Sequence, residues 1–130
     1  DLTRIVAVGT MPRRLKELSE VVLEAREAVF DALKPGVTCS DIDRASRRVI
    51  ARFGHGHRFG HSTGHGVGLE VHETPSLSAS RDHKLLPGAV VTVEPGIYLP
   101  GIGGVRIEDM VVVTASGYEV LSSLKREFKT

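Results

Sequence analysis

The sequence predicts an α+β domain in which two helices come first and antiparallel strands follow. Apolar residues recur at helical spacing in residues 15–33 and 42–53. After Gly54 this pattern gives way to glycine-rich segments and short β-branched runs, which are typical of strands and tight turns. We therefore expect one domain, residues 1–130, with two helices packed on one face of a curved, mostly antiparallel sheet.

The amino-terminal half is expected to hold one strand and both helices. Residues 2–8 place several apolar side chains on one parity, as a short strand does. Thr10 can cap the first helix, and Pro35-Gly36 ends it. The segment Thr38-Cys39-Ser40-Asp41 resembles a capping box at the start of the second helix, which closes at Gly54.

The carboxyl-terminal half is expected to hold strands joined by turns. The predicted strands are residues 67–71, 89–93, 97–99, 105–114 and 118–121, with residues 74–81 as a loop. Along residues 105–114, Arg106 and Glu108 share one face, and the valines and isoleucine share the other. The apolar face should pack on the helices. Asp109 interrupts that face, and a carboxylate there is costly to bury unless a charged group satisfies it.

Composition excludes several classes of function. The chain has 17 basic and 16 acidic residues, so it offers no basic patch for nucleic acid or for an anionic membrane surface. No apolar run approaches the length of about 20 residues that a membrane span needs, and the single cysteine excludes an internal disulfide. We expect a soluble, cytoplasmic domain. Because the chain opens at Asp1 without a methionine and inside a strand-like stretch, we also expect a piece of a longer protein.

Three histidines gather in one glycine-rich segment. His61, His65 and His72 fall within twelve residues, beside glycines that allow close backbone approach. Imidazole and carboxylate ligands together suit a divalent first-row metal, so the segment predicts a metal or catalytic site. Three further histidines in polar loops are expected at the surface: His55, His57 and His83.

Glu94 and Glu108 are the candidate carboxylates of the same site. Glu94 ends an apolar run before Pro95, so it either points into a cleft or is a solvated turn residue. Glu108 is either a site carboxylate or half of a surface ion pair with Arg106. Cys39, at a helix start, is interpreted as a small packing residue rather than a nucleophile. A phosphate-binding loop and a serine elbow are both excluded, because the glycine-rich turn precedes a strand and no G-x-S-x-G is present.

Three motifs in order carry a family resemblance. They are GHGVGLEVHE at residues 64–73, VEPGIY at 93–98 and GVRIED at 104–109. With the helical stretch between them and the amino terminus, residues 1–122 resemble the Xaa-Pro dipeptidase (prolidase) and aminopeptidase P branch of the pita-bread metallopeptidases. The resemblance implies a truncated pita-bread fold, namely the carboxyl-terminal portion of the catalytic domain. The upstream half and an amino-terminal domain would then be absent.

The resemblance also implies a site. The family binds two divalent metals through two Asp, one His and two Glu, and a hydroxide bridging the metals attacks the Xaa-Pro bond. The residues that match the ligands are Asp1, His65, Glu94 and Glu108. Glu94 would also take the proton of the water. His61 and His72 match histidines that contact substrate and stabilise the reacting carbonyl, and Arg106 matches an arginine that orients site carboxylates.

Some questions stay open at this point. The metal is Mn, Co or Zn, because all three suit this ligand set. The first Asp ligand would lie upstream, so the 130 residues alone are expected to be inactive and to bind little or no metal. The expected partners are a proline-containing peptide and, in the intact protein, a second copy in a homodimer. The alternatives are a metal-free binding module, a creatinase-like hydrolase or a methionine aminopeptidase, and dipeptidase is not separated from aminopeptidase P.

Overall fold

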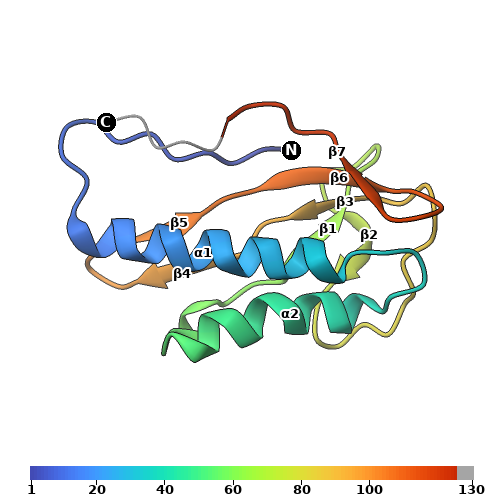
Figure 1. Cartoon of the computed structure of the whole chain (residues 1–130), viewed down its shortest axis with the longest axis horizontal. Helices are drawn as coiled ribbons and strands as arrows, with labels where there is room; N and C mark the ends of the chain where they lie inside the picture. The colour runs from blue at the N-terminus through green and yellow to red at the C-terminus, as the bar shows by residue number, and fades with distance from the viewer. Residues whose placement is uncertain (126–130) are drawn as a thin grey trace.

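The chain is an α+β structure, as predicted. In a computed structural model, residues 1–125 are described, so the last five residues of the predicted 1–130 domain lie outside the described part. Two helices lie side by side against antiparallel strands (Figure 1). The elements are α1 (Arg13–Ala32), α2 (Cys39–Arg52), η1 (Gly56–Arg58), β1 (Gly64–Gly66), β2 (Glu73–Leu77), β3 (Val90–Val93), β4 (Gly96–Leu99), β5 (Gly103–Arg106), β6 (Asp109–Val113) and β7 (Tyr118–Val120).

The described strands form two sheets, and every pairing is antiparallel. The larger sheet has five strands in the order β2-β1-β3-β6-β7, and β4 pairs with β5 in a two-stranded sheet. At its centre Gly66 pairs with Val91, and Val91 pairs with Val111. The strand β1 therefore lies between two neighbours, which places the glycine-rich segment inside the sheet.

Both helices are found where the apolar spacing predicts them, and one of the two N-caps differs from the prediction. At α2, Thr38 accepts a hydrogen bond from the backbone N–H of Asp41, as a capping box requires. At α1 the N-cap position is Pro12, which makes no side-chain cap bond, so Thr10 does not cap this helix. Proline suits the start of a helix because its φ is already fixed near the helical value and it has no N–H to satisfy.

The helices bury their apolar faces in two clusters. The first joins α1 and the end of α2 to the two-stranded sheet and includes Leu18, Val22, Ile50, Ile97, Val105 and Ile107. The second joins the facing ends of both helices to the larger sheet and includes Val29, Ile42, Leu77, Val91, Val93 and Val111. No helix in residues 1–125 is both long and apolar enough to cross a membrane.

Two predicted strands are wrong. Residues 2–8 are not a strand, since only Thr3 pairs there, in an isolated bridge to Glu108. Residues 67–71 are not a strand, with bends from residue 68 on, and the strand lies earlier, at β1. A Cβ atom added at Gly64 would lie 1.9 Å from the Thr92 carbonyl oxygen, so glycine is required for β1 to approach β3. The close backbone approach expected of the glycines is thus found within a pair of strands.

Two further predictions need correction. The predicted loop at residues 74–81 contains most of β2, which pairs with β1. The predicted strand 105–114 is split into β5 and β6, which belong to different sheets. The side-chain alternation nevertheless continues through the break, because Ile107 and Val111 are buried in the helix-facing core and Arg106 is exposed. The predicted orientation of this segment is thus correct.

Candidate metal centre

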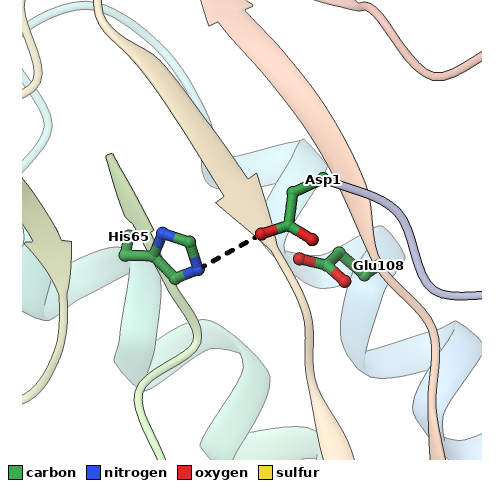
Figure 2. Close-up of side chains that lie close together, drawn as sticks. All are labelled: Asp1, His65 and Glu108. Atoms are coloured by element: carbon green, nitrogen blue, oxygen red, sulfur yellow. Dashed lines mark ion pairs between the residues drawn. The ribbon is translucent and has the colours of Figure 1, made fainter. Parts of the chain in front are cut away.

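Three residues that are distant in sequence converge on one point. Asp1, His65 and Glu108 each offer a ligand atom, and these atoms lie within 4.8 Å of one another. Figure 2 shows the imidazole of His65 directed toward the carboxylates of Asp1 and Glu108. Asp1 comes from the amino-terminal segment, His65 from β1, and Glu108 from the residue before β6. A fourth predicted residue joins them, because Glu94 Oε1 lies 3.1 Å from His65 Nε2.

The hydrogen bonds of His65 fit a cation at this point. Its Nδ1 lies 3.0 Å from the carbonyl oxygen of Gly66, which can only accept, so Nδ1 carries a hydrogen. In the neutral ring the lone pair is then on Nε2. That atom faces Glu94 Oε1 at 3.1 Å and Asp1 Oδ2 at 3.8 Å, and ionised carboxylates are acceptors too. Acceptors that face one another are unfavourable unless a cation or a proton lies between them. The donor set of imidazole and carboxylates suits Mn, Co or Zn.

Thr92 holds His65 and Glu94 together. This residue of β3 is fully buried. Its hydroxyl accepts a hydrogen bond from the backbone N–H of His65 at 3.0 Å and donates one to Glu94 Oε1 at 3.0 Å. The backbone N–H of Glu94 donates to the Thr63 carbonyl at 2.8 Å. The strand pairing and one hydroxyl group thus fix both side chains.

Thr3 fixes the side chain and the backbone of Glu108 in a similar way. The Thr3 hydroxyl donates to Glu108 Oε2 at 2.5 Å, and the Glu108 backbone N–H donates to the Thr3 carbonyl at 3.1 Å. Arg106 Nε donates to the same Thr3 hydroxyl at 3.3 Å. In the hydrogen bonds recorded for residues 1–125, Arg106 therefore reaches Glu108 through Thr3 and not directly.

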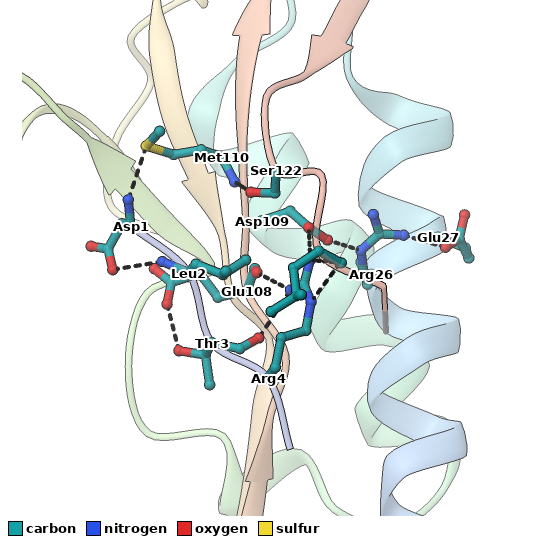
Figure 3. Close-up of polar contacts among 11 residues, drawn as sticks. Asp1, Leu2, Thr3, Arg4, Arg26, Glu27, Glu108, Asp109, Met110 and Ser122 are labelled. Atoms are coloured by element: carbon teal, nitrogen blue, oxygen red, sulfur yellow. Dashed lines mark hydrogen bonds and ion pairs between the residues drawn. The ribbon is translucent and has the colours of Figure 1, made fainter. Parts of the chain in front are cut away.

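An ionic cluster around Asp109 lies next to Glu108 (Figure 3). Asp109 is fully buried and accepts hydrogen bonds from Arg4 at 2.5 Å and from Arg26 at 2.6 Å. Arg4 also donates to the carbonyl oxygens of Thr3 and Glu108. Asp109 thus has the charged partners that the sequence required of it, and the cluster ties the amino-terminal segment to β6.

The predicted substrate histidines differ in their surroundings. His72 is exposed, and its ring lies beside that of His65, with 4.4 Å between centroids. His61 is directed to another partner, because its Nε2 lies 2.7 Å from the hydroxyl of Tyr98. The structure thus brings His72 to the candidate ligands and pairs His61 with a tyrosine. Among the loop histidines, His57 and His83 are exposed and His55 is half-buried.

Cys39 lies apart from this chemistry. The residue is fully buried at the start of α2, and burial raises the pKa of its thiol, which outweighs the lowering effect of its backbone hydrogen bond. A thiol held in its neutral form is a poor nucleophile. This agrees with its interpretation as a packing residue.

Comparison with known proteins assigns the chain to a family. Residues 1–115 match the model of metallopeptidase family M24. The chain belongs to this family. The Xaa-Pro dipeptidase of Pyrococcus horikoshii is 47% identical to this chain over 127 residues, which are 98% of this chain and 36% of that protein. The predicted family resemblance is confirmed.

Solved structures agree on the fold of this M24 chain. The X-Pro aminopeptidase of Thermotoga maritima superposes with a TM-score of 0.95 at 46% identity, covering 98% of this chain and 36% of that one. The Xaa-Pro dipeptidase of Bacillus anthracis gives a TM-score of 0.94 at 50% identity, with the same coverage. The predicted pita-bread fold is thus confirmed, and the chain spans 36% of the length of these relatives.

Three residues that hold predicted site side chains of this M24 chain are absent from the sequence-based predictions. Thr3 and Thr92 each bridge site groups through a hydroxyl, and Tyr98 binds His61. Thr3 and Tyr98 do lie in segments that carry the family resemblance, but their partners are 105 and 37 residues away in sequence. Thr92 had one available signal, since it is a hydroxyl residue in an otherwise all-valine strand.

Proposed function

We propose that the chain is the carboxyl-terminal portion of a metallopeptidase catalytic domain that hydrolyses Xaa-Pro peptide bonds, in a dipeptidase or an N-terminal aminopeptidase. One observation carries the proposal: the ligand atoms of Asp1, His65 and Glu108 lie within 4.8 Å of one another, with Glu94 beside His65. The similarity to proteins named Xaa-Pro dipeptidase and X-Pro aminopeptidase supports the substrate class.

Two divalent ions, Mn, Co or Zn, are proposed as cofactors. The residues that would hold them are Asp1, His65, Glu94 and Glu108, with a further carboxylate from the part of the protein upstream of this chain. When bound, such ions lower the pKa of water and polarise a carbonyl oxygen. The remaining chemistry belongs to side chains of this chain.

Glu94 is proposed to move the proton. A water molecule that attacks the scissile carbonyl must lose a proton, and the proline nitrogen must gain one before it leaves as an amine. A carboxylate fixed at both its side chain and its backbone can take the first proton and deliver it to the leaving nitrogen. Glu94 meets this condition, because Thr92 holds its Oε1 and the carbonyl of Thr63 holds its N–H.

The other residues are assigned by their surroundings. His72 is exposed beside His65, where its ring can donate a hydrogen bond to the charge that develops on the carbonyl oxygen. His61 is assigned to the substrate-binding part of the site together with Tyr98, to which its Nε2 is hydrogen-bonded. Arg106 is assigned to orienting Glu108, through the hydroxyl of Thr3. Because a bond to proline has no N–H, its recognition must rest on shape and on contacts outside that bond.

The experiment is hydrolysis of Ala-Pro by the full-length protein with added Mn²⁺ or Co²⁺, compared with the same protein in chelator. We expect metal-dependent release of proline, its loss in His65→Ala, and its retention in His83→Ala, a matched change at an exposed loop histidine. Release of methionine from a Met-Ala peptide, or hydrolysis of creatine, without action on Ala-Pro would favour the alternative hydrolases. An inert full-length protein that binds no metal would favour a binding module.

The 130-residue chain alone is expected to bind these ions weakly and to show no detectable turnover. Its candidate centre brings three carboxylates together, and without the upstream ligand and both ions their repulsion is not neutralised. Titration calorimetry with Mn²⁺ on both proteins measures the difference. Robust turnover by the chain alone would contradict this. A homodimer remains our proposal for the full-length protein, to be checked by analytical ultracentrifugation.

A further inference from the structure

Both ring nitrogens of His61 are already used by the protein. Nδ1 lies 2.8 Å from the carbonyl oxygen of Ser62, which can only accept, so Nδ1 donates. In the neutral ring Nε2 then carries the lone pair, and it accepts from the hydroxyl of Tyr98 at 2.7 Å. While these two bonds stand, His61 has no nitrogen left for a substrate.

The ring of His61 is also confined by its neighbours. The ring of Phe59 meets it edge-on, with 5.0 Å between centroids and an interplanar angle of 90°. Arg47 of α2 donates to the carbonyl oxygens of Phe59 and His61, which fixes the backbone on both sides of Gly60. Rotation of the imidazole toward a ligand would therefore break several contacts at once.

The ring of Tyr98 is closely packed against backbone and yet remains accessible to solvent. Its ring lies against the backbone of Gly96 and of Gly104, the residue opposite it in β5, because a Cβ atom at either glycine would lie 2.6 Å from an atom of the tyrosine side chain. The residue is 37% exposed, whereas its strand neighbours Ile97 and Leu99 are buried. The ring is thus held in place without contributing to the core.

The pair lies on the two segments that leave the candidate metal centre. His61 stands four residues before His65, and Tyr98 stands four residues after Glu94. The hydrogen bond from the Glu94 N–H to the Thr63 carbonyl joins these segments between the centre and the pair.

We infer that the hydroxyl of Tyr98, and not an imidazole nitrogen of His61, is the group of this pair that contacts the peptide, and that His61 is the positioning residue behind it. This rests on the proposed function. Because Tyr98 gives its hydrogen to Nε2, its oxygen offers lone pairs and takes an N–H donor. In Ala-Pro the proline nitrogen has no hydrogen, so the only N–H donor is the amino-terminal ammonium group. Tyr98 is therefore assigned to that ammonium group.

The test uses the metal-loaded full-length protein and two substrates, Ala-Pro and its des-amino analogue propanoyl-proline. We expect Tyr98→Phe to lower kcat/KM for Ala-Pro about ten- to a hundredfold, mainly through KM, and to leave the analogue unchanged. His61→Ala should cost a similar factor, and adding it to Tyr98→Phe should cost little more, because the two residues act as one unit. Tyr118→Phe is the matched control, since it removes a hydroxyl from a residue of similar exposure, 39%, stacked on Phe30.

Long-range ¹H–¹⁵N spectra of the histidine rings test the hydrogen bond without any turnover. The expected pattern is His61 protonated on Nδ1, with an Nε2 resonance that shifts in Tyr98→Phe. A hydrogen on Nε2 in the neutral ring would overturn the assignment. So would wild-type selectivity for Ala-Pro over the analogue in Tyr98→Phe, or a large further loss when His61→Ala is added. A wild-type protein that is inert on both substrates would instead overturn the proposed function, and this assignment with it.

Discussion

Arg26 of α1 and Asp109 of β6 form an ion pair with both side chains buried, and Nε lies 2.6 Å from Oδ2. The second oxygen of the same carboxylate accepts from Arg4 at 2.5 Å. A single acidic group therefore joins a helix to the amino-terminal segment that carries Asp1 (Figure 3).

Replacing Arg26→Met should destabilise the chain strongly. The change leaves the buried Asp109 carboxylate with one cation fewer, and breaking a buried pair costs about 3–5 kcal/mol. Urea denaturation of the 130-residue chain measures the free energy of unfolding. The control is Arg13→Met, whose pair with Glu17 is exposed and should matter little. Equal losses in the two variants would contradict the importance of the buried cluster.

Arg4→Met should weaken metal binding more than it weakens the fold. Arg4 ties the amino-terminal segment to β6 through the carboxylate of Asp109 and the carbonyls of Thr3 and Glu108. Without it we expect Asp1 to lose its fixed position, with about tenfold weaker Mn²⁺ binding by the full-length protein in calorimetry. Amide exchange at the Glu108 N–H, which is bonded to the Thr3 carbonyl, should become faster. Unchanged affinity together with faster exchange would show that the segment does not position the site.

Thr92→Val keeps the shape of the side chain and removes the hydroxyl that bridges His65 and Glu94. The buried N–H of His65 would lose its acceptor, at a cost of about 1–3 kcal/mol. Glu94 would lose a donor to Oε1, so Mn²⁺ affinity should fall about 10- to 100-fold. Thr114→Val, just after β6, is the isosteric control. If both variants bound Mn²⁺ like the wild type, Thr92 would have no part in positioning.

Cys39 should make the stability of the chain fall at high pH. Burial raises the pKa of its thiol in the folded state, so folding favours the protonated form. The resulting stabilisation is complete below the ordinary thiol pKa of about 8.5 and is lost as the pH rises through the higher folded value. Cys39→Ala has no thiol and therefore lacks this pH-dependent stabilisation. The difference in unfolding free energy between the wild type and Cys39→Ala should shrink above about pH 8.5. A difference that is constant from pH 7 to 10 would contradict this contribution of the Cys39 thiol to stability.

Much of the fold follows from local pattern. The helical spacing in α1 and α2, the cap at Thr38 and the valine run of β3 are all local signals, and each is found where it was expected. Side-chain parity also gave the correct face for Ile107 and Val111. It could not reveal the break between β5 and β6, because the alternation of side chains continues across it.

The candidate site was only partly predictable, for a related reason. His65, Glu94 and Glu108 stand in sequence motifs, so they can be singled out without a structure. The location of β1 was missed because Gly64-His65-Gly66 has no alternating apolar side chains, although Gly64 is needed for contact with Thr92. The hydroxyl of Thr3 finds its partner Glu108 across 105 residues, and no local pattern contains such a pairing.

Because the alternation of side chains continues into β6, two successive acidic residues face opposite ways. Glu108 is directed to the candidate metal centre, and Asp109 to the helix. Deleting one residue between Val105 and Glu108 would shift the alternation by one and exchange these directions. Asp109 would then leave its two arginines, and Glu108 would leave the other candidate ligands. The length of this segment is therefore fixed from both sides, unlike the turn at residues 115–117, where insertions should be tolerated.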